Sequence, residues 1–139
     1  MLWKKEVTAE LVNMAGANTI LEHLGIVITE IGDDYVKGTM PVDHRTHQPA
    51  GLLHGGASVV LAETLGSFAG SLTVEFPNET VVGVEINANH VRGVRSGIVT
   101  GVARPIHIGG RTQVWEIKIN NEKEELVCIS RLTLAVLRK

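Results

Sequence analysis

The sequence predicts an α+β domain in which an antiparallel β-sheet wraps one long central helix, and three observations lead to this class. Two short strand-like segments precede residues 55–72, that segment is apolar nearly all round, and four long strand-like segments follow it. A helix that is apolar on every side belongs in the interior. A sheet with one apolar face needs a covering layer, so the two surfaces satisfy each other.

The segments before the long helix predict two short helices and a β-hairpin. Thr8 is a residue type that caps helix N-termini. The segment 24–31 is rich in Ile and Val and alternates weakly, which is typical of a strand, and Gly32-Asp33-Asp34 indicates a turn. The expected elements are a helix over 8–14, a helical turn over 19–23, and strands over 24–31 and 35–42.

The segments after residue 42 predict a loop, the long helix and an all-β remainder. A polar loop over 43–53 leads into the helix, and Pro77 interrupts the chain beyond it. The expected strands cover 81–91, 97–107, 112–121 and 124–137. The last two are joined by a short polar turn, which predicts a long antiparallel hairpin.

Length and composition limit the classes of function. A chain of 139 residues is expected to form one domain over 1–139. The net charge of −2 gives no basic bias and argues against a nucleic-acid partner. The single cysteine, Cys128, suits a reducing compartment. The start MLWKKEV has no apolar run long enough for a signal peptide. No segment reaches the roughly 18 apolar residues of a membrane span, so we expect a cytoplasmic protein without a membrane partner.

The start of the long helix offers backbone donors to a ligand. Gly55 and Gly56 open it, and the first N–H groups of a helix have no partner within it while its dipole is positive there. Glycine lets a ligand approach closely, so this end suits a carbonyl oxygen that gains negative charge. Gln48 could add a side-chain N–H, and His54 could orient the ligand or the loop. A glycine-rich helix start without a ligand explains the same residues equally well.

Glu63 is the candidate for chemistry, because it is a carboxylate surrounded in sequence by apolar residues. It lies eight residues after Gly55, which is about 12 Å along a helix axis. One helix therefore cannot bring its own Glu63 to a carbonyl held at its own Gly55. Either the two features are unrelated, or two antiparallel helices meet across a dimer axis. Ser67, one turn beyond Glu63, could hold a water or the carboxylate. A glutamate at a solvated edge is the alternative.

Other chemical motifs are missing or weak. The histidines show no HExxH spacing and the chain has no CxxC motif, so no metal site is predicted. A G-x-S-x-G nucleophile motif and a glycine-rich phosphate loop are also absent from the sequence. Arg92, Arg95 and Arg111 stand beside small residues at strand turns, a setting that suits phosphate. A solvated turn is the alternative for each arginine, and a half-buried polar position is the alternative for the nearby His90 and His107.

Several stretches together resemble the hotdog-fold acyl-CoA thioesterases. The central stretch is HGGASVVLAETLGS, and the others are MPVDHRTHQPAGLLHGG, VVGVEINANHVRGVRSG, QVWEIKI and SRLTLAV. Within the family, the chain is similar to the branch of the phenylacetic-acid-pathway and 4-hydroxybenzoyl-CoA thioesterases that use a glutamate catalyst. The resemblance implies a sheet wrapped around a helix, a homodimer with paired sites, and a dimer of dimers.

The resemblance also implies roles for individual residues. Glu63 matches the nucleophile or general base, Gly55 the backbone donor to the thioester carbonyl, and Gln48 the side chain beside it. His54 matches the motif histidine, and Ser67 the hydroxyl that assists the water. The positions that match CoA- or substrate-binding residues are Gly83, His90, Val91, Arg92, Gly93, His107, Ile108, Gly109, Gly110, Arg111 and Thr112.

Two positions depart from the family pattern. Gly93 stands where relatives often have proline, which loosens the turn expected to contact CoA. Gly110-Arg111 varies among relatives, so the residue that meets the CoA phosphates stays open.

We therefore predict a thioester hydrolase that splits acyl-CoA into the free acid and CoA, with no metal or redox cofactor. The likeness to the aryl branch implies an aromatic acyl group, such as 1,4-dihydroxy-2-naphthoyl-CoA of menaquinone synthesis or an aryl thioester on a carrier protein. A hotdog dehydratase or hydratase is the alternative enzyme, in which His54 and Glu63 would flank a C–H bond beside the carbonyl. A non-catalytic acyl-CoA-binding module is the alternative outside enzymes, although sensors of this fold carry a DNA-binding helix-turn-helix.

Overall fold

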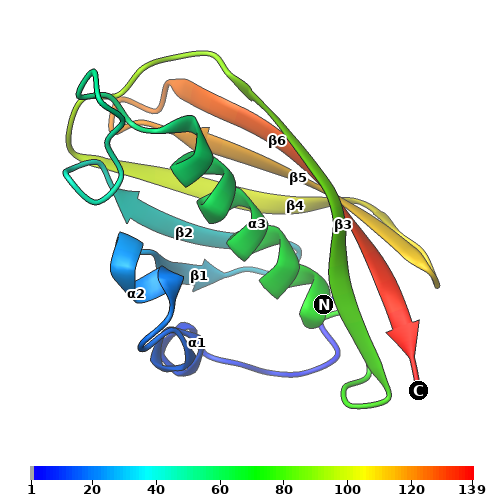
Figure 1. The fold of residues 1–139 in the computed structure, drawn as a ribbon. Helices are drawn as coiled ribbons and strands as arrows, with labels where there is room; N and C mark the ends of the chain where they lie inside the picture. The colour runs from blue at the N-terminus through cyan, green and yellow to red at the C-terminus, as the bar shows by residue number, and fades with distance from the viewer. Residues whose placement is uncertain (1) are drawn as a thin grey trace.

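A computed structural model describes residues 2–139 as a six-stranded antiparallel sheet with the long helix α3 (Gly55–Ser71) across one face. The strand order is β1-β2-β4-β5-β6-β3, and Figure 1 shows the sheet curving around α3. The strands are β1 (Val27–Ile31), β2 (Val36–Pro41), β3 (Glu79–His90), β4 (Ile98–Ile108), β5 (Thr112–Asn120) and β6 (Leu126–Arg138). The predicted α+β class and hotdog arrangement are confirmed.

The two short N-terminal helices are α1 (Ala9–Ala15) and α2 (Ile20–Leu24), and each has a threonine N-cap. The strand expected from residue 24 begins instead at Val27, because α2 continues to Leu24. Gly25 then ends α2 in the left-handed conformation, with a φ of 71°, which glycine adopts without steric cost. No helix within residues 2–139 is long and apolar enough to cross a membrane.

The predicted hairpin at the end of the chain is confirmed as β5 and β6. These strands pair antiparallel from Thr112↔Ala135 to Asn120↔Leu126. The second strand starts two residues later than predicted, because Glu124 takes a positive φ of 60° in the turn. That backbone conformation is uncommon for a residue with a side chain, so the turn interrupts the strand before Leu126.

The helix approaches the sheet closely because small residues face large ones. Gly38 of β2 pairs with Gly101 of β4, and Leu65 of α3 fills the space above them: a Cβ at either glycine would lie within 2.8 Å of a Leu65 methyl carbon. Leu65 is completely buried, and burying such a side chain contributes about 1.5–3 kcal/mol. This contact holds the middle of α3 against the sheet.

A series of buried hydrogen bonds connects the end of α3 to β5. Trp115 Nε1 donates to Gln113 Oε1 over 2.9 Å, Gln113 Nε2 donates to Thr73 Oγ1 over 2.7 Å, and Thr73 Oγ1 donates to Gly70 O over 2.8 Å. Because each buried polar group has a partner, the chain avoids the cost of unsatisfied donors. The helix is thereby anchored at the end opposite to Gly55.

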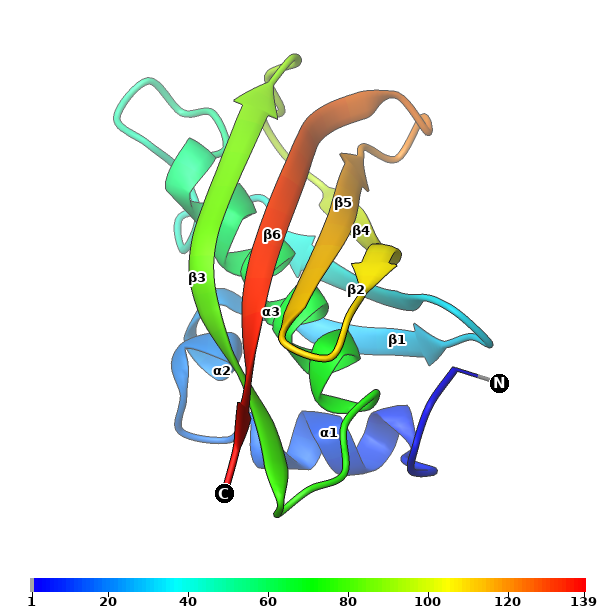
Figure 2. The same ribbon diagram turned by 90° about the vertical axis from the view of Figure 1, so that its right-hand side faces the viewer.

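Strand β3 lies at one edge of the sheet, where it pairs only with β6 (Figure 2). It is 12 residues long, and its exposed apolar side chains include Val82 and Val84. A long unpaired apolar edge is a template for pairing with another strand. Natural proteins cover such an edge or use it, so β3 is the candidate surface for contact with a second chain.

Candidate active site

The N-terminus of α3 leaves one backbone donor free. His54 is the N-cap, and its Nδ1 accepts the N–H of Gly56 over 2.8 Å. The His54 carbonyl accepts the N–H groups of Ala57 and Ser58. Within residues 2–139, the N–H of Gly55 has no acceptor. The predicted donor residue is therefore available to a ligand at the positive end of the helix.

His90, at the end of β3, packs directly against Gly55. A Cβ placed on Gly55 would lie 2.9 Å from His90 Nε2 and 3.1 Å from its Cε1. Real Cβ atoms do not approach so closely, so the imidazole can keep this position only beside a glycine. The contact brings a predicted CoA-binding residue against the predicted backbone donor.

A pocket of about 410 Å³ opens where these residues meet. Its lining residues are Gln48, Leu52, Leu53, Gly55, Ser58, His90, Val91, Arg92, Gly93 and Val127. Six of these were predicted as site residues, and they come from the loop, the helix start and the end of β3. The four that were not predicted are small or apolar. Ser58 alone carried a usable signal, because it follows Gly55 by one helical turn.

The loop before α3 orients Gln48. The side-chain carbonyl of Gln48 accepts the N–H of Ala50, and the Gln48 backbone N–H donates to Leu52 O over 2.8 Å. With its oxygen engaged, the amide of Gln48 has its NH2 group left as the donor for the pocket. Gly51 permits this tight loop with a φ of 79°.

Further contacts fix the same loop to the segment after β3. His47 Nε2 lies 2.8 Å from Arg95 O, and the Leu53 N–H donates to Val94 O over 2.8 Å. At the start of the loop, hydrogen bonds from Arg45 hold the pKa of the Asp43 carboxyl well below its ordinary value. Hydrogen bonds therefore hold the loop that carries Gln48 at both of its ends.

Glu63 lies in the middle of α3, half-buried, and outside this pocket. Its Oε2 rests against Gly83 of β3, 2.6 Å from where a Cβ would stand. The hydroxyls of Thr64 and Ser71 donate to backbone carbonyls of α3. Within residues 2–139 the Ser67 hydroxyl makes no such bond, so it is the free hydroxyl one turn from Glu63.

The predicted segment His107–Thr112 lies at the other end of the sheet from His90. Thr112 pairs with Ala135, which pairs with Val82, whereas His90 pairs with Cys128. At about 3.3 Å per residue, Val82 and His90 are about 26 Å apart along β3. Figure 1 shows the β4–β5 turn and the loop before α3 at opposite ends of the molecule.

The three candidate phosphate-binding arginines differ in their surroundings. Arg92 Nη1 lies 3.4 Å from Glu125 Oε2. Arg95 and Arg111 are exposed and form no ion pair within residues 2–139. Within the same part of the chain, no three His, Cys, Asp or Glu residues are grouped so as to hold a metal ion.

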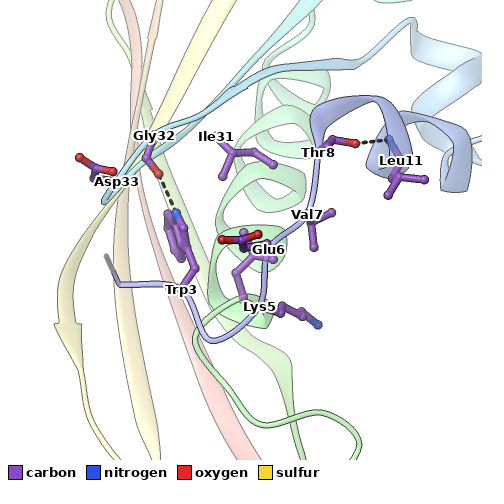
Figure 3. Close-up of a pocket in the computed structure, with 10 residues that line it drawn as sticks. Trp3, Lys5, Glu6, Val7, Thr8, Leu11, Ile31, Gly32 and Asp33 are labelled. Atoms are coloured by element: carbon purple, nitrogen blue, oxygen red, sulfur yellow. Dashed lines mark hydrogen bonds between the residues drawn. The ribbon is translucent and has the colours of Figure 1, made fainter.

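A second pocket, of about 460 Å³, lies between the N-terminal segment and the end of α3, and contains none of the predicted site residues. In Figure 3 the Trp3 indole points at Gly32, to whose carbonyl it donates over 2.6 Å, and Thr8 caps α1. The Trp3 and Thr8 polar groups are thus bonded within the fold. Leu72, at the end of α3, lines this pocket.

Residues 50–128 match the family model described as the thioesterase superfamily. The 1,4-dihydroxy-2-naphthoyl-CoA hydrolase of Escherichia coli is 56% identical over 137 residues, which cover 99% of this chain and 100% of that protein. The proofreading thioesterase EntH of Cronobacter sakazakii is 54% identical and covers 99% of both chains.

Solved structures are similar as well. A thioesterase of Haemophilus influenzae superposes with a TM-score of 0.96 and is 56% identical, covering 99% of this chain and 96% of that one. Two mutants of one Staphylococcus aureus thioesterase superpose with TM-scores of 0.83 and 0.81 at 39% identity, covering 86% and 84% of this chain and 99% and 97% of those chains. One replaces a glutamate and the other a glutamine with alanine, 15 positions apart.

Proposed function

We propose that this chain, which belongs to the thioesterase superfamily and is a thioester hydrolase, hydrolyses aromatic acyl-CoA at sites that two copies of the chain form together. The observation that carries the proposal is the free N–H of Gly55 beside the Gln48 amide, with Glu63 half-buried farther along the same helix. The Gly55 N–H and the Gln48 amide can hold a thioester carbonyl, and the Glu63 carboxylate can attack its carbon.

In the proposed reaction, the thioester oxygen accepts hydrogen bonds from Gly55 N–H and the Gln48 side chain. Both donors are fixed before substrate arrives, because His54 caps the helix and Ala50 holds the Gln48 oxygen. Preorganised donors stabilise the negative charge that develops on this oxygen. The charge of the helix N-terminus adds to the same effect.

The carboxylate comes from the second copy in this proposal. Gly55 contacts His90 at one end of the helix-facing side of β3, and Glu63 contacts Gly83 nearer the other. When two β3 edges pair antiparallel with Gly83 of each copy opposite His90 of the other, Glu63 of one copy lies beside Gly55 of its partner. An isologous contact of this kind creates two identical sites.

The same pairing supports one composite binding site for CoA. The β4–β5 turn lies near the Val82 end of β3, and Arg92 and Gly93 follow its other end. Antiparallel pairing therefore brings the turn of one copy toward Arg92 and Gly93 of the other. Arginines from both segments would then surround the CoA phosphates, for which guanidinium groups are suited.

Glu63 then either attacks the thioester carbon directly or removes a proton from a water that attacks it. Ser67 would hold that water. In the first route the C–S bond breaks as an anhydride forms between Glu63 and the acyl group, and water then hydrolyses that anhydride and restores the carboxylate. In the second route water adds to the thioester carbon and the C–S bond breaks directly. In both routes the sulfur leaves as the CoA thiol after gaining a proton, and water supplies the oxygen. The dehydratase alternative is disfavoured, because His54 Nδ1 is already bonded to Gly56 N–H.

Comparison with the Staphylococcus aureus mutants supports the assignment of Gln48 and Glu63 to one reaction. Their glutamine and glutamate substitutions are 15 positions apart, the same separation as Gln48 and Glu63 in this chain. We take both residues to be part of the catalytic machinery here.

The substrate class is proposed from the relatives. One is named a 1,4-dihydroxy-2-naphthoyl-CoA hydrolase and another a proofreading thioesterase, so we propose an aromatic acyl group and a place in menaquinone synthesis. An aryl group on a carrier protein is the second candidate. We further propose a homotetramer built from two such dimers, and a cytoplasmic location that agrees with a single unpaired cysteine.

Replacing Glu63 with glutamine tests the mechanism. The substitution keeps the shape of the side chain and removes the base, so hydrolysis of benzoyl-CoA should fall by at least about 10²-fold. The thiol released is measured with a chromogenic disulfide, and an unchanged mass of the native oligomer is the control for folding. Near-native turnover in this variant would contradict the proposed role of Glu63.

A further inference from the structure

We infer that Gly83 is a positioning residue: because it lacks a side chain, the Glu63 carboxylate can rest against β3 at the place where the reaction needs it. This differs from the CoA contact that resemblance implies for Gly83. The inference rests on the proposed role of Glu63, and the experiments below separate the two.

The space beside Gly83 is filled by the carboxylate alone. A Cβ on Gly83 would lie 2.6 Å from Glu63 Oε2 and 3.7 Å from its Cδ. Apart from adjacent residues, no other atom within residues 2–139 lies within 4 Å of that position. A methyl group at Gly83 and the carboxylate in its present position therefore exclude each other.

An irregularity in β3 turns Gly83 toward the helix. The pairing with β6 shifts between Gly83 and Glu85, so Val84 is an extra residue. Gly83 and His90 are an odd number of residues apart in the sequence. In a regular strand they would therefore face opposite sides of the sheet. The bulge places both on the side of α3, where Gly83 meets Glu63 and His90 meets Gly55.

Contact with β3 matters because little else restrains the carboxylate. Within residues 2–139, Glu63 forms no side-chain hydrogen bond and no ion pair, and the residue is half-buried. A glutamate side chain has several rotatable bonds, and ordering it costs conformational entropy. A nucleophile or base that is displaced by about 1 Å can lose about 10²-fold in rate. A rigid strand backbone at Gly83 limits that displacement.

The first test is Gly83→Ala. The new methyl group would meet only the end of a flexible side chain, so the fold should persist while the carboxylate moves. We expect kcat to fall about 10²-fold for both benzoyl-CoA and a small benzoyl thioester that lacks the nucleotide, with KM changed little. A rise in KM confined to benzoyl-CoA would overturn the inference and assign Gly83 to CoA binding.

Gly93→Ala is the matched comparator. A Cβ there would make ordinary contacts of 3.5 and 3.7 Å with Leu52, and Gly93 belongs to the proposed CoA site. Gly93→Ala should raise the KM for benzoyl-CoA more than that for the small thioester and change kcat little. The two glycine variants thus give opposite patterns.

A double-mutant cycle decides whether Gly83 acts through Glu63. We expect Gly83→Ala to cause no further loss of the residual activity of Glu63→Gln, because residues that act as a unit are not additive. A second loss of similar size in the double variant would overturn the inference and leave the role of Glu63 intact. Near-native activity in Glu63→Gln alone would instead remove the proposed function and this inference with it.

If Gly83→Ala is unstable, melting temperatures and the mass of the native oligomer, measured in two backgrounds, show the cause. In a Glu63→Ala background the atoms that the methyl group would strike are absent. Instability that disappears in this background supports the contact. Instability that persists there shows that β3 itself requires glycine, and overturns the inference.

Discussion

At the residue scale, the candidate site depends on two glycines that provide space. Gly55 makes room for the His90 ring and Gly83 for the Glu63 carboxylate. Neither has a positive φ, unlike Gly25, Gly51 and Gly97, so the requirement is for an absent side chain and not for a special backbone conformation. Alanine at either position would be compatible with the local backbone and incompatible with the neighbouring functional group.

The burial of a single residue is easiest to predict where its chemistry contrasts with that of its neighbours. Glu63 stood out as a charge among apolar residues, and it is half-buried as that contrast suggests. Gly70, on the same helix, faces the sheet, because a Cβ there would collide with a Leu134 methyl carbon. Because α3 is apolar nearly all round, the sequence pattern cannot distinguish its two faces.

Cys128 should be chemically inert in the folded protein. It is completely buried, and this burial raises the pKa of its thiol. A raised pKa keeps the thiol protonated at pH 8, and the thiolate is the reactive form. We expect no labelling of the native protein by a chromogenic disulfide over the minutes of an assay, and one thiol per chain after unfolding in guanidinium. Rapid stoichiometric labelling of the native protein would contradict the buried position.

At the element scale, the positions of helices and strands were predictable and their ends were not. The predicted helix 55–72 matches α3 to within one residue, because glycines begin it and its apolar run defines it. The predicted start of β1 is wrong because α2 extends to Leu24. The predicted start of β6 is wrong because Glu124 takes a positive φ. No feature of a glutamate predicts that conformation.

The β4–β5 turn should bind the CoA part of the substrate through Arg111. This residue is exposed and unpaired within residues 2–139, and charge-assisted bonds to phosphate contribute about 1.5–3 kcal/mol. Arg111→Ala should raise the KM for acyl-CoA about tenfold or more and leave that for a small thioester unchanged. Steady-state kinetics on both substrates measure the difference.

Arg104→Ala is the matched control for this substitution. Arg104 lies on β4, where it pairs with Asp34 and stacks on Tyr35, outside the proposed site. Its loss should not change either KM. Equal loss on both substrate types in Arg111→Ala would indicate a disturbed fold and would contradict the CoA role.

At the scale of the whole molecule, the predicted residues separate into groups that one chain does not bring together. Gln48, Gly55 and His90 share a pocket, whereas Glu63 lies about 12 Å along the helix from Gly55. Helix geometry alone predicted that separation and suggested a second copy. The sequence could not predict that β3 forms the edge of the sheet, because strand order depends on contacts between distant segments.

Mixing two inactive variants tests the shared site. In a heterodimer of Glu63→Ala and Gln48→Ala chains, one of the two sites contains wild-type residues at both positions. Random exchange of subunits should therefore restore about a quarter of the wild-type activity per chain. The thiol-release assay measures the recovery, and mass spectrometry of the intact oligomers measures the exchange.

The control mixes Glu63→Ala with a chain that carries both substitutions, which forms no complete site in any combination. Activity that returns in the first mixture and not in the second supports the antiparallel pairing of β3. Complete exchange without recovery would show that each site is built within one chain.

The outward stripe of α3, which the second copy would cover, leads us to expect a preference for aryl over alkyl groups. Val60, Glu63, Ser67 and Phe68 share this stripe and are half-buried. A Phe68 ring can pack edge-on against an aromatic acyl group beside the carboxylate. A rigid aryl group also loses less rotational freedom on binding than an alkyl chain does.

We expect kcat/KM for benzoyl- or naphthoyl-CoA to exceed that for short straight-chain acyl-CoA by at least about tenfold, which requires a difference of about 1.4 kcal/mol. Cyclohexanecarbonyl-CoA is the control for size, because it matches benzoyl-CoA in volume and lacks a flat ring. Long alkyl chains should still react, since apolar pockets discriminate weakly by length. A preference for acetyl- or butyryl-CoA in the thiol-release assay would contradict the aryl assignment and leave the assignment as a thioester hydrolase unchanged.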